Sequence, residues 1–444
     1  MNEAVPGAGS ALDPTWLSAS AASRLIASGQ LSSLELVRAC LDQISSREAT
    51  VRAFAHVDAD GALREAARRD AMPAVGPLHG VPVAVKDVIE VAGMPCGMGS
   101  PIYDHFVPFA DAACVAALRA AGAVIIGKTV TAEFAGVTPG PTTNPLAPDR
   151  TPGGSSSGSA AALASGMVPI ALGTQTGGSI LRPASFCGVF GFKPSFGTIS
   201  RAGLKLAAEG LDTIGVLARE IVDVALSFSV LVGRKPIDLA ARSSPPRLLL
   251  YQGHHWSRAT ADTVAAVQVT ADRFRASGAQ IDELPTPPGI EQLSEARAVI
   301  NAYERARSLA WEWQHHAGQI SPRMSQVLAQ GSALSFNKYL EAMSVAAHWR
   351  AWFANVMQAY DGVLTASANG EAPRGLGSTG DAAFQEIWTI FQLPSISLPL
   401  CTGQSGLPVG VQLVGHARAD EALLNLAAWA VEKASSRPRS PASR

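Results

Sequence analysis

The sequence predicts an α/β protein, and three observations support that prediction. Apolar runs typical of buried strands alternate with amphipathic helical segments along the chain, which is the pattern of a sheet covered by helices. Of the 444 residues, 47% are hydrophobic and only 16% are charged, so the chain can bury a large core and is not a disordered scaffold. No internal repeat or long low-complexity linker divides the chain, which favours one large body.

The first elements are indicated by a helix cap and by a valine-rich run. Ser32 and Glu35 have the spacing of a capping box, and apolar residues recur after them at helical intervals, so a helix is expected over 31–44. Residues 78–87 read LHGVPVAVKD, in which valines alternate behind a glycine. This pattern predicts a buried strand whose end carries Lys86.

The remaining elements continue the alternation. Asp111 is expected to cap an Ala-rich helix that runs into an apolar strand over 123–130. Residues 246–285 repeat the order strand, helix, strand. Residues 290–360 are expected to be mostly helical and are rich in aromatic residues, for which helix packing is favoured over the lining of a substrate pocket. Two further strands, a closing helix and a frayed tail are expected over 393–400, 406–415, 421–433 and 435–444.

Charge and cysteine content exclude several classes of function. Lys and Arg total 35 against 36 Asp and Glu, a net charge of -1 that provides no basic footprint for nucleic acid or an anionic membrane. The five cysteines form no CxxC pair, so neither a disulfide framework nor a structural zinc site is indicated, and a reduced, cytoplasmic protein is expected. No run reaches the roughly 18 apolar residues that a membrane span requires.

Residues 151–200 carry the strongest chemical signal. They contain ten of the 41 glycines and only two charged residues. The clusters TPGGSSSGSA and GTQTGGSI have the spacing neither of a phosphate loop nor of a nucleophile elbow. Gly177 and Gly178 directly precede Ser179, so the chain can turn there and aim successive backbone amides at one point. Such a turn is suited to an oxyanion hole for acyl transfer.

A serine nucleophile needs a base, and the residues leave two interpretations open. The histidines are expected at structural or exposed positions, so none is favoured as the base. Lys86 follows an apolar strand, where burial favours the neutral amine that can accept a proton. An ion pair between Lys86 and Asp87 is an equally good interpretation of the same residues.

The chain resembles the amidase signature family, whose hydrolases use a Ser-cisSer-Lys triad. The similarity is carried by GVPVAVKD, GKTVTAEFA, TPGGSSSGSAAALASG to GGSILRPASFCGVFGFKPSFG, DTIGVLARE and GLPVGVQLVG, at 80–87, 127–135, 151–197, 212–220 and 406–415. By this resemblance Ser179 is the nucleophile, Ser155 bridges after a cis Gly154–Ser155 peptide, and Lys86 is the general base. It also implies an oxyanion hole and no metal or organic cofactor; the oxyanion amides are those of Thr176, Gly177, Gly178 and Ser179.

The resemblance also implies the architecture. We expect one amidase signature domain over 1–434, with a mixed, many-stranded β-sheet covered by α-helices. Its core is expected at about 75–220 and about 385–433, with a variable substrate-pocket region at about 290–375.

The segment around the nucleophile departs from many family members. These carry an Asp four residues before the nucleophile and an Arg two residues after it, where this chain has Gln175 and Leu181. Arg182 follows, as in malonamidase-like members, in which the corresponding Arg meets a substrate carboxylate. Arg182, Gln175 and Gly154 are therefore candidate substrate-binding residues, and packing under the loop is an equally good explanation of Arg182.

The expected function is hydrolysis of a carbon–nitrogen acyl bond in a small-molecule amide, anilide or carbamate, which includes aryl acylamidase and urethanase activity. Few charges near the catalytic loops and the Trp-rich region over 290–360 favour an uncharged, aromatic substrate, whereas Arg182 leaves a malonamate-type carboxylated amide as an alternative. A second alternative is the glutaminase subunit of a tRNA-dependent amidotransferase, against which Gln175 and Leu181 argue. A third, a non-catalytic binding protein, is disfavoured because all three triad residues are present, and a homodimer is left open.

Overall fold

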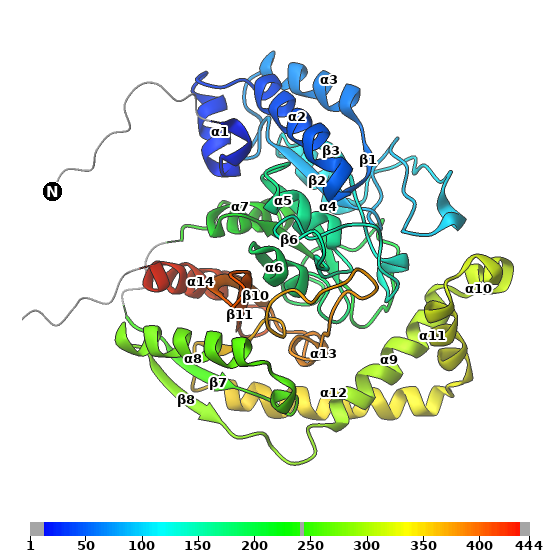
Figure 1. The fold of residues 1–444 in the computed structure, drawn as a ribbon, viewed down its shortest axis with the longest axis vertical. Helices are drawn as coiled ribbons and strands as arrows, with labels where there is room; N and C mark the ends of the chain where they lie inside the picture. The colour runs from blue at the N-terminus through cyan, green and yellow to red at the C-terminus, as the bar shows by residue number, and fades with distance from the viewer. Residues whose placement is uncertain (1–12, 240–243, 436–444) are drawn as a thin grey trace, which may run out of the picture.

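The strands of this protein form one mixed sheet, which confirms the predicted fold class (Figure 1). The structure is a computed structural model and describes residues 13–239 and 244–435. Eleven strands lie in the order β1-β3-β2-β4-β6-β5-β10-β11-β9-β7-β8. They are β1 (Phe54–Val57), β2 (Pro82–Lys86), β3 (Val124–Thr129), β4 (Ile170–Gln175), β5 (Phe190–Lys193), β6 (Thr213–Ala218), β7 (Arg247–Tyr251), β8 (Gln280–Leu284), β9 (Gly362–Ala366), β10 (Ser395–Thr402) and β11 (Pro408–Val414).

Helices pack on both faces of this sheet. They are α1 (Ala19–Ala27), α2 (Ser33–Val51), α3 (Ala59–Asp70), α4 (Ala113–Ala120), α5 (Ser157–Ala164), α6 (Leu181–Cys187), α7 (Ile221–Leu231), α8 (Ala261–Ala276), α9 (Gln292–Ser308), α10 (Ala310–His316), α11 (Pro322–Ala333), α12 (Phe336–Met357), α13 (Glu386–Ile390) and α14 (Asp420–Ser435). The expected tail lies, except for Ser435, outside the described residues.

The two predicted helix caps have different outcomes. The Ser32 hydroxyl accepts a hydrogen bond from Glu35 N while the Glu35 carboxylate accepts one from Ser32 N, so the capping box is confirmed and begins α2. The prediction that Asp111 caps α4 is wrong. Its carboxylate accepts a hydrogen bond from Ala92 N and forms a 3.0 Å ion pair with Arg119, so these partners occupy it in place of the helix end.

Strand β2 shows how the sheet divides the core into two layers. Val83 and Val85 pack in a cluster with α4 and α7, whereas Ala84 between them packs with α2 and α5 on the other face. Alternate residues of a strand point to opposite faces, and helices cover both, so every residue of β2 is buried.

One edge of the sheet brings together strand ends that are distant in sequence. Strands β2, β3 and β4 are parallel, so their carboxyl ends lie side by side, and the antiparallel neighbour β6 begins at the same edge. Farther along the edge lie the end of β5, the start of β10 and the end of β11. Ligands of α/β proteins commonly bind at the carboxyl ends of parallel strands.

The aromatic residues of the long helices serve mainly as packing. Trp349 and Phe353 are buried on α12, and the Phe353 ring lies 5.4 Å from that of Trp388 and 5.1 Å from that of Phe391. Trp311 is 52% exposed. Helices α9 and α12 therefore join the sheet through a shared core that contains these aromatic residues. The helices α9–α12 lie at the lower right of Figure 1.

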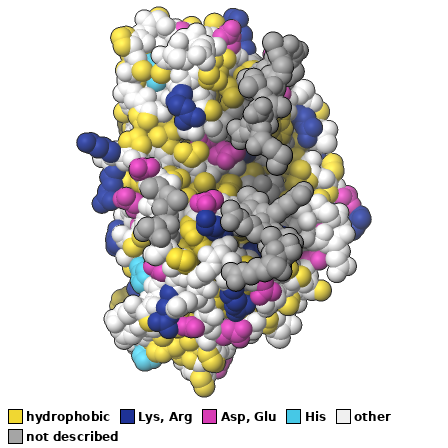
Figure 2. Space-filling view, turned by 90° about the vertical axis from the view of Figure 1, so that its left-hand side faces the viewer, with side chains coloured by type: hydrophobic (Ala, Val, Ile, Leu, Met, Phe, Trp, Pro, Cys, Tyr) yellow, Lys and Arg dark blue, Asp and Glu magenta, His cyan; other side chains and the backbone are white. Residues whose placement is uncertain are grey.

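The surface carries charges of both signs. Figure 2 shows one face on which Lys and Arg side chains lie among Asp and Glu side chains, in keeping with the net charge of -1. Within residues 13–239 and 244–435, no helix is long and apolar enough to cross a membrane. Over the same residues, no three His, Cys, Asp or Glu side chains gather as a metal site.

Candidate active site

Lys86 and Ser155 meet at the carboxyl end of β2. Lys86 is the last residue of this central strand and is fully buried, and its Nζ lies 2.7 Å from Ser155 Oγ and 2.7 Å from Thr174 Oγ1. The alternative ion pair with Asp87 does not form. Asp87 is paired instead with Lys128, the penultimate residue of β3, at 2.7 Å.

The surroundings of Lys86 favour its neutral form. Burial is the largest cause and holds the pKa of Lys86 well below its ordinary value. Asp212 raises this pKa, and the nearby Arg305 and Arg182 guanidinium groups lower it. No carboxylate among the described residues hydrogen-bonds to the amine, so its partners are hydroxyl and carbonyl groups.

A backbone contact brings the two Ser/Gly clusters together. The Gly154–Ser155 peptide is cis, and Ser156 N donates a 3.2 Å hydrogen bond to the carbonyl of Ser179. Ser155 is completely buried and Ser179 is 7% exposed. Of the four serines in the first cluster, it is Ser155 whose hydroxyl contacts Lys86.

The loop after β4 presents unpaired backbone amides. The Thr389 hydroxyl donates a 2.8 Å hydrogen bond to the Gly177 carbonyl, and Arg182 N donates one to the Gly178 carbonyl. The N–H of a trans peptide points away from its C=O, so these contacts direct the amides of Gly178 and Ser179 to the other side. No described residue accepts a hydrogen bond from the amides of Gly177, Gly178 or Ser179.

Asp212 supports the beginning of this loop. Its carboxylate accepts a 2.5 Å hydrogen bond from the Thr176 hydroxyl and two more from the backbone of the 207–208 segment. Burial raises the pKa of Asp212, while these hydrogen bonds lower it. The position lies in the DTIGVLARE motif, which indicated a family resemblance but no role for this side chain.

Arg182 lies against the same loop from the side of α6. Its Nη2 donates to the Gly154 carbonyl at 2.5 Å and to Thr379 Oγ1 at 3.2 Å, and its Nε and Nη1 have no hydrogen-bond partner among the described residues. A Cβ on Gly178 would lie 3.2 Å from Arg182 Nη1, which shows how close the guanidinium is to the loop. Burial lowers the pKa of Arg182 to about 10, although Asp381 and Glu386 oppose the shift.

Gly154 and Gln175 occupy positions that the protein itself fills. A Cβ on Gly154 would lie 2.8 Å from Thr379, so a side chain has no room there. The side-chain oxygen of Gln175 (Oε1) accepts hydrogen bonds from the backbone N–H groups of Ile180 and Leu181. The side-chain nitrogen (Nε2) donates to Thr389 Oγ1. These contacts make Gln175 a support for the start of α6 and do not favour the expected contact with substrate.

A family model described as Amidase matches residues 35–424. The chain belongs to the amidase family. It is an amide-cleaving enzyme by this membership, which confirms the family resemblance and the enzyme class.

Proteins similar to this amidase have several different functions in their names. It is 33% identical over 463 residues to a glutamyl-tRNA(Gln) amidotransferase subunit of Roseiflexus castenholzii, covering 92% of this chain and 94% of the relative. A solved structure named only as an amidase is 30% identical with a TM-score of 0.87, over 94% of this chain and 100% of the other. The peptide amidase of Stenotrophomonas maltophilia is 26% identical with a TM-score of 0.81, over 96% and 99%.

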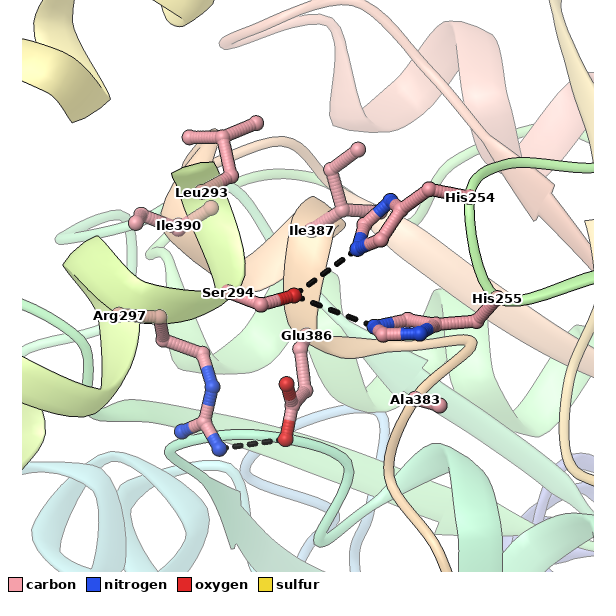
Figure 3. A pocket seen from close by; sticks show the side chains of 9 residues that line it. All are labelled: His254, His255, Leu293, Ser294, Arg297, Ala383, Glu386, Ile387 and Ile390. Carbon is pink, nitrogen blue, oxygen red and sulfur yellow. Dashed lines mark hydrogen bonds and ion pairs between the residues drawn. The ribbon is translucent and has the colours of Figure 1, made fainter. Parts of the chain in front are cut away.

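The amidase also has polar groups beside the loop that sequence reasoning did not find. Arg297 of α9 pairs with Glu386 of α13 at 2.5 Å, and a Cβ on Gly177 would lie 3.7 Å from Arg297 Nη1. Figure 3 shows this pair beside His254 and His255, whose rings both hydrogen-bond to the Ser294 hydroxyl, at 2.9 and 3.1 Å.

Thr389→Val should test whether α13 holds the amidase loop in its working geometry. Valine keeps the shape of threonine but cannot donate to Gly177 or accept from Gln175. We expect kcat to fall roughly tenfold to a hundredfold with a smaller change in KM, and the free energy of unfolding to fall by about 1–3 kcal/mol, because buried polar groups lose their partner. Steady-state kinetics and urea unfolding measure both. Thr389→Ser, which restores the hydroxyl, should recover kcat, and an unchanged kcat in Thr389→Val would contradict the role given to this contact.

Proposed function

We propose that this amidase hydrolyses the carbon–nitrogen acyl bond of a small molecule through an acyl-enzyme on Ser179, with Ser155 and Lys86 as the proton relay. The observation that carries the proposal is the buried Lys86 amine, 2.7 Å from Ser155 Oγ and without a carboxylate partner among the described residues. A buried, unpaired lysine is costly to a fold unless it is neutral, and a neutral amine is a base.

The proposed reaction has two halves. Ser179 Oγ attacks the substrate carbonyl carbon while its proton passes to Ser155 and the Ser155 proton passes to Lys86 Nζ. The oxyanion is stabilised by the loop amides, for which the unpaired N–H groups of Gly177, Gly178 and Ser179 are the candidates. The relay then returns a proton to the departing amine. Water attacks the acyl-enzyme by the same route, releasing the carboxylic acid and free Ser179.

The protonation state of Lys86 predicts how the rate depends on pH. Neutral Lys86 is required in the first step, so the rate should fall as the pH drops through the pKa of Lys86. Burial lowers the pKa of Lys86, so the enzyme should stay active at pH values well below the ordinary pKa of a lysine. The pH profile of kcat/KM measures this limb.

Substrate charge is the finer question, and Arg182 supports the carboxylated alternative. Its guanidinium lies beside Gly178 with two N–H bearing atoms unpaired among the described residues. The expectation of an aromatic anilide or carbamate rested partly on the Trp-rich helices. Trp349 and Phe353 are instead buried in the core, so they offer that preference little support.

The glutaminase alternative is supported in part by the names of two relatives, which are glutamyl-tRNA(Gln) amidotransferase subunits A. Those names also support a reaction that involves tRNA. The net charge of -1 argues against direct binding of tRNA by this chain. Such a role would require partner subunits to use the ammonia, whereas a stand-alone amidase would turn over its substrate without them.

One assay on the chain purified alone separates these substrates. We expect turnover of a neutral anilide, of malonamate or of both, and much slower turnover of glutamine. If Arg182 binds a carboxylate, Arg182→Ala should lower kcat/KM for malonamate at least about tenfold more than for the anilide, because a charge-assisted hydrogen bond contributes about 1.5–3 kcal/mol. An equal loss for both substrates would assign Arg182 to loop packing. Preference for glutamine would favour the amidotransferase role.

A further inference from the structure

A cavity lies on the same edge of the sheet as the catalytic loops. It has a volume of about 290 Å³, near the lower end of the range for small-molecule sites, and lies between α12, the end of β5, the start of β10 and the end of β11. None of its lining residues comes from the segments 151–182. It is therefore separate from the Ser179 loop.

The charged side chains that line this cavity are cationic. Arg350 of α12 lines it, together with His416 and Arg418 in the turn after β11. Neither arginine forms an ion pair with a described residue, and Arg350 Nε is buried without a hydrogen-bond partner there. Arg350 Nη2 donates a 2.8 Å hydrogen bond to the carbonyl of Ile390. Nε is not accessible, so the Arg350 atom left to donate to a ligand is Nη1, which has no hydrogen-bond partner among the described residues.

The acidic group next to this cavity is already engaged. Asp420 accepts a 2.7 Å hydrogen bond from Ser195 N, and its charge acts on the buried Lys193. One engaged carboxylate does not neutralise two arginines, so the cavity retains a positive charge that an anion would balance.

The rest of the cavity lining is largely apolar and aromatic. Phe353 and Phe391 are stacked with their centroids 5.1 Å apart and line the cavity together with Met357. We propose that the cavity binds an organic anion with a planar apolar body, such as an aromatic carboxylate. Its carboxylate is received by Arg350 and Arg418, and its ring packs on the phenylalanines and the methionine. The amide hydrolysis proposed above does not need this site, so anion binding here and catalysis at Ser179 can be tested independently.

Binding of 2-naphthoate to the full chain tests the site. Calorimetry should show one saturable site, and 2-naphthylmethanol, which has the same ring system without the charge, should bind at least about tenfold more weakly. The double variant Arg350→Met with Arg418→Met should weaken naphthoate binding by a similar factor. Ala354→Trp, which adds a large side chain to the lining of the cavity and leaves both arginines in place, should do the same.

The matched control removes two charges elsewhere. Arg38 and Arg64 are exposed on α2 and α3, and Arg38→Met with Arg64→Met should leave naphthoate affinity within about twofold of the wild-type value. Circular dichroism checks that each variant is folded, and Ala354→Trp carries the test if the double arginine variant is not. Absence of saturable binding up to about 10 mM, or unchanged affinity in either folded cavity variant, would overturn the proposal.

Discussion

Ser179→Ala is expected to abolish acyl-enzyme formation and to lower kcat for amide hydrolysis at least about 1,000-fold, because the attacking oxygen is removed while the relay and the loop stay in place. The measurements are the burst with an activated ester, covalent labelling by a fluorophosphonate, and steady-state turnover. The side chain is small and 7% exposed, so the variant should fold as the wild type does.

Ser157→Ala provides the control for this experiment. Ser157 belongs to the same Ser/Gly cluster as Ser155, but its hydroxyl makes a 3.4 Å hydrogen bond to the Val130 carbonyl and none to Lys86. This variant should label and turn over at close to the wild-type rate. Full labelling of Ser179→Ala by the fluorophosphonate would remove Ser179 from the role proposed for it.

Lys86→Met is expected to have the second large effect, a fall in kcat of at least about 1,000-fold, because methionine fills the space of the lysine stem but cannot take the proton from Ser155. The free energy of unfolding, in contrast to kcat, should not fall. The pKa of Lys86 is lowered in the folded protein, so the unfolded chain binds more protons than the folded one at pH values between the folded and the unfolded pKa of this lysine. That difference opposes folding at neutral pH and disappears in Lys86→Met, whose free energy of unfolding should not be lower than that of the wild type.

Lys193→Met is the matched control. Lys193 is also fully buried, and burial lowers its pKa to about 7, but its amine donates to the carbonyls of Pro194 and Leu393 and lies outside the proposed relay. It should retain the chemistry that Lys86→Met loses. Wild-type kcat in Lys86→Met, or an equal loss of kcat in folded Lys193→Met, would contradict the assignment of Lys86 as the base.

Much of the site could be predicted because its signals are local in sequence. Gly177, Gly178 and Ser179 are consecutive, and the valines before Lys86 predict a strand from their spacing alone. The helix cap at Ser32 could be predicted for the same reason, since its partner is three residues away. Arg297 and Glu386 could not, because the two residues are 89 positions apart and only the packing of α9 on α13 joins them.

Some polar side chains have partners in distant segments of the chain. For these, the sequence either did not identify the partner or favoured the wrong one. Asp111 has the position of a helix cap, but its carboxylate is taken by Ala92 and Arg119. Gln175 replaces an acidic residue beside the nucleophile and was therefore a candidate for substrate contact. In the fold its amide is occupied by the start of α6 and by α13.

By itself, the sequence determined the family, the α/β fold class and the short list of residues able to form a serine relay, because these depend on ordered motifs and on the periodicity of apolar residues. Only the tertiary structure excluded the ion pair between Lys86 and Asp87. The adjacent strand β3 supplies Lys128 to Asp87, which leaves Lys86 buried beside Ser155 without a counter-charge among the described residues. Burial and pairing are properties of surrounding segments, so the same lysine that sequence allows as an ion-pair partner becomes a candidate base in the fold.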